Sequence, residues 1–291
     1  MAVPNYLREQ VYQIRSEANA IMQALEGQAA ADMAGFIDRV LAMLGEAIAA
    51  GDVTGADSIV AAAEIAIDQI AFHGANVMQQ LAGDVFDVSL RSQVATMDAF
   101  GTLSARQLAV ATQSFSATFR PDLLSNGHRQ WYERMSQTLN APDSLLRKAL
   151  IESEVYGESL TDVATRLVES GGDAALDPGV DAMRRAKRFV RTESTRVDTA
   201  TSVTFAESIG VKKFLNMGIG DTRQAPECEF ASEQGALTID EWNKLTFRGV
   251  PVGAPPRHPH CRCGFHGVPE PFTPSDDLLI SAGIIEEGDR L

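Results

Sequence analysis

Residues 5–26 read NYLREQVYQIRSEANAIMQALE and open a stretch without proline that continues to Pro121. Their apolar side chains recur at alternating spacings of four and three residues: Leu7, Val11, Ile14, Ala18, Ile21 and Leu25. Such a seam is typical of helices that pack along their length in a heptad pattern. The sequence therefore predicts a helical bundle or a stack of helical hairpins. A second interpretation leaves one seam open for a partner.

The same periodicity extends outward from this seam. We expect further helices at 32–50, from about Asp57, from about Asp84, and at 131–140, 144–157, 160–169 and 178–208. Turns are expected at Gly51, at 120–122, at Asn126-Gly127 and at Gly210. After Gly210 the sequence consists of short apolar runs among prolines and glycines. These runs predict a strand at 212–217 and a helix at 238–245. The fold class is thus mainly α: long helices first, then a small α+β C-terminal domain.

This pattern suggests three segments. Residues 1–140 form a helical region suited to binding a partner, residues 141–268 a second domain, and residues 269–291 an acidic tail.

Composition excludes several classes of protein. The chain has 291 residues, of which 45% are hydrophobic and 22% charged, so wholesale disorder is excluded. No apolar run reaches the ~18 residues of a membrane span, and no signal peptide is visible. A net charge of −14 argues against a surface that binds nucleic acid as a whole. Three cysteines without an export signal favour a reducing compartment.

The densest group of metal-ligand residue types is PPRHPHCRC at 255–263, with Cys228 about 30 residues upstream. Cys228, Cys261, Cys263 and one histidine, His258 or His260, would fill a tetrahedral structural zinc site. Because alternate residues of a strand share a face, Cys261 and Cys263 can both ligate only where the chain bends around the metal. The competing interpretation is three buried, unligated cysteines and a surface histidine pair.

The helix at 178–208 carries the main positive stripe, with six bases against one acid between Arg184 and Arg196. Arg184, Arg188 and Arg191 share one face, which could contact phosphates, an acidic partner, or acids of the same chain. Few aromatic residues accompany them, so sequence-specific reading of nucleic acid is not expected. The common nucleotide-binding, nucleophile-elbow and zinc-protease motifs are absent, and the sequence predicts no catalytic residues and no enzyme.

Five motifs in order carry a resemblance to a known family. They are Arg191-Thr192-Glu193, Gly210-Val211-Lys212-Lys213-Phe214, Asp221-x-Arg223-x-x-Pro226-x-Cys228, Gly235, and Pro255-Pro256-x-His258-Pro259-x-Cys261-Arg262-Cys263. Over residues 145–268 the chain resembles the phage Mu F-like head morphogenesis family of minor head proteins. Gln224 and Phe214 stand where threonine and tryptophan are common in that family, and neither is a proposed ligand.

The resemblance implies a structural, non-enzymatic minor head protein of a tailed phage or prophage. Its partner would be the portal protein inside the capsid, with the major capsid or scaffolding protein and packaged DNA as further contacts, and no membrane. It would act in head assembly and in DNA packaging or ejection, residing in the head interior of the virion and, during assembly, in the host cytoplasm. It also implies His258 as the nitrogen ligand and a polar network of Arg191, Glu193, Asp221 and Arg223 that locks the long helix to the C-terminal subdomain. The alternatives are a metal-dependent hydrolase or nuclease and a zinc-stapled DNA-binding module.

Overall fold

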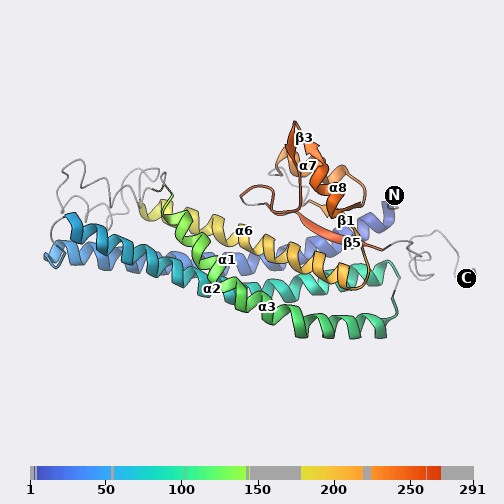
Figure 1. Cartoon of the computed structure of the whole chain (residues 1–291), viewed down its shortest axis with the longest axis horizontal. Coiled ribbons are helices and arrows are strands. Elements are labelled where there is room, and N and C mark those ends of the chain that lie inside the picture. Colours follow the sequence, from blue (N-terminus) through green and yellow to red (C-terminus); the bar gives the residue numbers. More distant parts are fainter. Residues whose placement is uncertain are drawn as a thin grey trace, which may run out of the picture. The chain divides into compact units, whose positions relative to one another are not determined.

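The computed structural model describes residues 3, 5–53, 56–101, 103–141, 144, 178–218, 224–259 and 261–269. Within them lie four long helices, two short helices and five strands (Figure 1). The long helices are α1 (Asn5–Ala50), α2 (Ala56–Ala99), α3 (Ala105–Leu139) and α6 (Pro178–Ser208). The expected mainly α chain with a small strand-containing C-terminal region is confirmed. The predicted helices at 144–157 and 160–169, and nearly all of the acidic tail, fall outside the described residues.

The long helices are fewer and more continuous than predicted. The two helices expected before Gly51 are one helix, as are the two expected from Asp57 and Asp84. Helix α3 continues without a break through Pro121 and Gly127, where turns were predicted. The prediction of a turn was wrong because side-chain packing outweighs the low helix propensity of glycine here. A Cβ on Gly127 would overlap the buried indole of Trp131, so this glycine allows a close contact inside a helix. The predicted ends at Gly51 and Gly210 are confirmed, and both glycines have positive φ.

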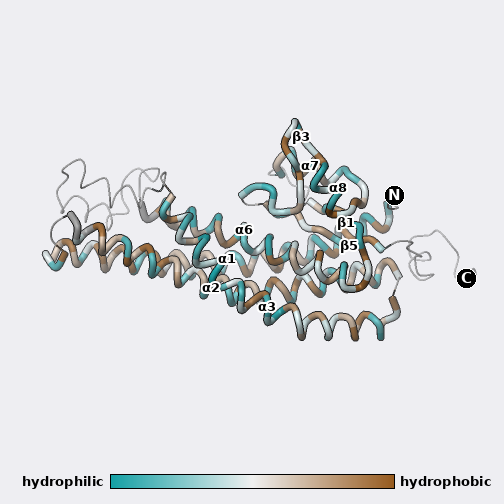
Figure 2. Tube along the Cα trace, viewed as in Figure 1, coloured by the Kyte–Doolittle hydropathy of each residue, from teal (hydrophilic) through white to brown (hydrophobic). Residues whose placement is uncertain are grey.

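The buried face of α1 follows a different repeat from the predicted heptad. Ile21 is 48% exposed and Ile14 only half-buried. Most of the buried positions recur at spacings of four, four and three: Leu7, Val11, Arg15, Ala18, Met22, Glu26, Ala29, Met33, Ile37, Val40, Leu44 and Ile48. Asn19 and Leu41 are buried beside this line. A repeat of 11 residues in three turns matches the straight helix better than seven residues in two. Hydrophilic and hydrophobic residues alternate along the long helices (Figure 2). The buried stripe of α1 itself includes two charged residues, Arg15 and Glu26.

The C-terminal region is built on a small antiparallel sheet in the order β2-β1-β5. Its strands are β1 (Lys213–Met217), β2 (Leu237–Thr238) and β5 (Gly264–Val268), and β1 pairs with β5 over its full length. A two-stranded hairpin of β3 (Thr246–Phe247) and β4 (Val250–Pro251) and the helices α7 (Pro226–Glu233) and α8 (Ile239–Lys244) complete it. The predicted strand and the predicted helix near 238–245 are confirmed; α7 was not predicted.

The chain divides into two compact units that are interleaved along the sequence. Unit 1 comprises residues 1–25, 82–123 and 194–291, and unit 2 comprises residues 26–81 and 124–193. The units do not follow the segments 1–140 and 141–268.

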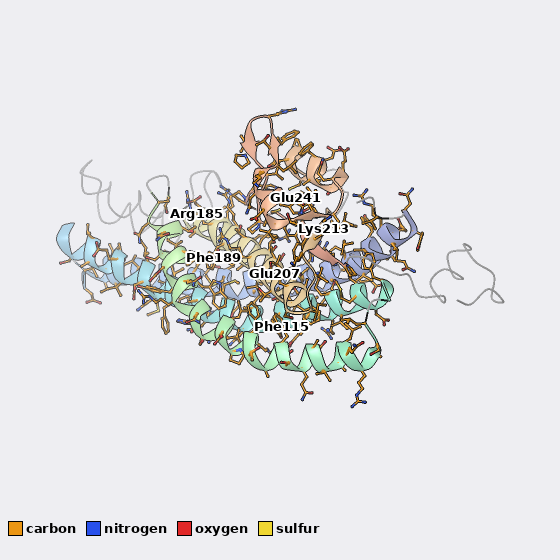
Figure 3. The ribbon with its side chains drawn as sticks, turned by 45° about the vertical axis from the view of Figure 1, so that its right-hand side comes forward. Phe115, Arg185, Phe189, Glu207, Lys213 and Glu241 are labelled. Atoms are coloured by element: carbon orange, nitrogen blue, oxygen red, sulfur yellow. The ribbon has the colours of Figure 1, made fainter. Side chains whose placement is uncertain are left out.

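Aromatic side chains dominate the core of unit 1. Trp242 contacts Phe265 with its ring tilted, and Phe115 on α3 (labelled in Figure 3) contacts Phe86 and Phe205. A second cluster joins Leu7 and Val11 of α1 to Leu215, Met217 and Val268 of the sheet. The first turns of α1 are therefore part of the same core as the C-terminal sheet.

Candidate metal centre

Cys228 lies in the first turns of α7, a helix that begins at Pro226. Proline suits the first helical position because its missing N–H would have no partner there. Glu227 and Glu229 add acidic groups to the first turn, where a helix favours them. Together these three residues are the local signal for α7 that the sequence analysis missed.

Cys261 and Cys263 lie on an irregular segment immediately before β5. The backbone turns just upstream, where the N–H of Cys261 donates to the carbonyl of His258 at 3.1 Å. Thr195 of α6 donates its hydroxyl to the carbonyl of Cys261 at 2.7 Å. The chain therefore bends at this point, as two ligands at i and i+2 require.

The three sulfur atoms converge. All three lie within 4.8 Å of one another, and none of the three residues is more than 2% exposed. Cys228 Sγ lies 3.8 Å from Cys261 Sγ, the separation expected between two thiolates ~2.3 Å from one tetrahedral zinc ion. No disulfide joins them. Three buried cysteines this close can hold a metal ion.

His258 reaches this cluster from the side of Cys228. Its Nε2 lies 3.1 Å from Cys228 Sγ, and its Nδ1 lies 2.8 Å from the carbonyl oxygen of Pro259. A proton on Nδ1, donated to that carbonyl, leaves the lone pair on Nε2 facing the thiols. His258 does not join the set in which every donor atom lies within 4.8 Å of every other. His260, the competing nitrogen ligand, falls outside the described residues.

The thiols have strongly divided proton affinities. Hydrogen bonds from Cys228 and Cys263, and then from the backbone N–H groups of Arg257 and Cys263, lower the pKa of Cys261 far below its usual range despite burial. The hydrogen bond to Cys261 raises the pKa of Cys228, as do its bond to Cys263 and burial. The three thiols thus share hydrogen bonds with one another, and thiolate is the form of cysteine that binds a metal.

A chain of hydrogen bonds links the two segments that carry the cysteines. Arg257 Nη1 donates to Asn216 Oδ1 at 2.8 Å, and Asn216 Nδ2 donates to Ser232 Oγ at 3.1 Å. Ser232 Oγ in turn donates to the carbonyl of Cys228 at 2.9 Å. The Arg257 guanidinium also lies over the ring of Trp242. These residues position the ligands, and the sequence analysis missed them because their spacing shows no motif.

Two of the four residues of the predicted polar network have described partners. Arg191 Nε lies 2.5 Å from Glu26 Oε2, and Arg134 Nη1 lies 2.6 Å from Glu193 Oε2. These contacts join α6 to α1 and α3 within unit 2, and the link between this helix and the C-terminal subdomain stays a prediction. Asp221 and Arg223 fall outside the described residues.

The predicted basic face has two exposed members, Arg184 and Arg188. Arg191 is half-buried and paired with Glu26, so it is not a third exposed contact. Arg185, next to Phe189 along α6 in Figure 3, pairs with Asp181 at 2.7 Å. The free positive charge of this face is thus smaller than the sequence suggests.

Unit 1 also contains a buried polar cluster that the sequence analysis did not find. Arg15 Nη1 lies 2.7 Å from Asp198 Oδ2, both side chains being at most 3% exposed, and Ser89 donates to Asp198 Oδ1 at 2.6 Å. His266 Nδ1 lies 3.0 Å from Thr96 Oγ1. Burial, and then the charge of Arg15, lower the pKa of His266 to about 3, so the ring is neutral. The guanidinium of Arg15 occupies the space that a Cβ on Gly264 would need, which explains that glycine.

In comparisons with family models, curated proteins and solved structures, none matched this chain. Among the described helices, none has the length and apolar character needed to cross a membrane.

Proposed function

We propose that this chain is a structural, non-enzymatic minor head protein of a tailed phage or prophage, and that Cys228, His258, Cys261 and Cys263 bind one structural zinc ion. One observation carries the proposal. Residues about 30 positions apart, in the order and spacing of the head morphogenesis motifs, meet at a single buried cluster. Thiolate and imidazole are the donors that zinc prefers, and a site closed by four protein ligands is structural.

The donor set favours a structural role over a hydrolase or nuclease. Among the described residues, no carboxylate joins the three sulfurs within 4.8 Å. Hydrolytic metal sites need an open coordination position and a base within reach of the bound water. Zinc would supply a cross-link between α7 and the segment before β5, and the residues of this chain would do the rest of the positioning.

Metal content tests the first half of the proposal. Protein purified without added metal should contain about one zinc ion per chain, and chelation should destabilise it, because structural zinc contributes directly to folding. A content below ~0.2 ions per chain, with no loss of stability in chelator, would contradict the metal assignment.

Co-expression with the portal protein of its own phage or prophage tests the second half. The tagged chain should retain the portal protein through affinity and size-exclusion steps, and absence of the portal from the complex would contradict the assembly role. Truncation of residues 1–30 is not a suitable control. Leu7 and Val11 pack with the sheet, and Arg8 donates to the carbonyls of Ser232 and Gln234, so the truncation would disrupt unit 1 itself.

A further inference from the structure

An open groove of about 1050 Å³ lies in unit 1 and is lined by α1, α2 and α3. Its accessible apolar lining includes Ile21, which is 48% exposed, and the half-buried Leu25 and Val94. Val88 and Leu108 also line it but are buried. The metal centre does not use this surface.

The walls of the groove suit a helix. Small side chains line it at Ala95 on α2 and at Ala105 and Ala109 on α3, which lets another helix backbone approach closely. The α2 residues that line it extend from Asp84 to Asp98. At 1.5 Å per residue these two positions lie about 21 Å apart, the length of a helix of about 14 residues.

The charged residues around the groove favour a partner with basic residues. Asp84 and Asp98 are exposed, and neither forms an ion pair within the described residues. Asp87, between them, is 3.0 Å from Arg120, and Arg91 is the single basic residue of the lining. The two ends of the groove therefore carry uncompensated negative charge, on a chain whose net charge is already −14.

We propose that this groove binds an amphipathic helix of a partner protein, about four turns long, with an apolar face and lysine or arginine near both ends. The apolar face would cover Ile21, Val94 and Ala109, and the basic ends would meet Asp84 and Asp98. The inference goes beyond the proposed function, because it needs neither a phage head nor a metal ion.

Two labelled 18-residue peptides test it against the full-length chain. Both carry the same leucine and alanine stripe; one has lysines at its ends, the other glutamates. By fluorescence anisotropy, the lysine peptide should bind at least ~10-fold more tightly at low salt, and 0.5 M NaCl should reduce the difference. Equal affinities for the two peptides, or binding to anionic lipid vesicles in place of the peptide, would overturn the proposal.

Variants locate the binding site. Ala109→Trp fills the groove and should weaken the lysine peptide by at least ~10-fold. The matched control is Ala117→Trp, at an exposed position of α3 that does not line the groove, and it should bind normally. Wild-type affinity in Ala109→Trp would refute the assignment. Should that variant fail to fold, the double variant Asp84→Lys/Asp98→Lys decides alone: it must reverse the preference between the two peptides, and an unchanged preference would refute the proposal.

Discussion

The long helices and the segment from Val211 to Val268 are stabilised by different means. In α1, one buried stripe repeats every 11 residues, and its two charges each meet an opposite charge on α6. The C-terminal segment has strands of two to five residues and helices of six and eight, which offer little regular burial. Its order rests on an aromatic core and on the cysteine cluster. We therefore expect the C-terminal segment to be more sensitive than the long helices to removal of a bound metal.

The largest expected effect is on the metal centre. Chelation, or Cys261→Ser, should remove the tertiary structure around Trp242 but leave most of the helical signal, since metal binding in small sites contributes ~10 kcal/mol or more to folding. Trp131→Phe leaves Trp242 as the single tryptophan, so its fluorescence can be compared with circular dichroism at 222 nm. Simultaneous loss of both signals would show that helices and C-terminal segment depend equally on the metal.

The second effect concerns the buried ion pair of unit 1. Asp198→Asn leaves the charge of Arg15 buried without its partner, and we expect a loss of ~3–5 kcal/mol in the free energy of unfolding. Arg15→Met/Asp198→Leu should recover part of that loss, because the double variant leaves no unpaired charge at this site. Glu133→Gln, which breaks the more exposed pair with Arg129, is the matched control and should cost under ~1 kcal/mol in urea unfolding. A small effect of Asp198→Asn would mean that apolar contacts alone carry the helices.

The sequence predicted what depends on local pattern. The ends at Gly51 and Gly210, the strand at 212–217 and the grouping of the three cysteines all follow from short-range signals, and all are found. The continuity of α1 and α3 could not be predicted. Gly127 and Pro121, for example, are residue types that usually end a helix, and only the packing against residues such as Trp131 shows that α3 continues through them.

The buried polar residues were missed for a related reason. Arg15 and Glu26 lie in the buried stripe, but an analysis of apolar periodicity places charged residues on the surface. Their partners Asp198 and Arg191 lie far along the chain. Asn216 and Ser232, which link the two segments of the metal centre, belong to no spacing rule. Such contacts appear only once the fold brings distant segments together.

The third effect is a pH dependence carried by His266. Its folded pKa of about 3 lies below the usual value of 6.5, so the unfolded chain binds more protons between these two pH values. Stability should fall with decreasing pH below about 6.5, by up to ~1.4 kcal/mol per unit. Urea unfolding at pH 7 and pH 5 should show a smaller fall in His266→Gln than in the parent chain. Identical pH dependence would mean that His266 is not kept neutral by its burial.

The smallest effect concerns the exposed face of α6. Arg184 and Arg188 are exposed, whereas Arg191 is engaged with Glu26, so two arginines remain for a phosphate backbone. Each phosphate contact adds ~0.9 to the slope of log affinity against log salt, which predicts a slope of about 1.8 for double-stranded DNA of any sequence. Arg184→Gln/Arg188→Gln should abolish this binding and change the free energy of unfolding by less than ~0.5 kcal/mol, because neither side chain is buried. A slope near 3 would require a third contact, from the exposed Lys187 or from Arg191 released from Glu26. Salt-independent binding would exclude a phosphate contact at this face.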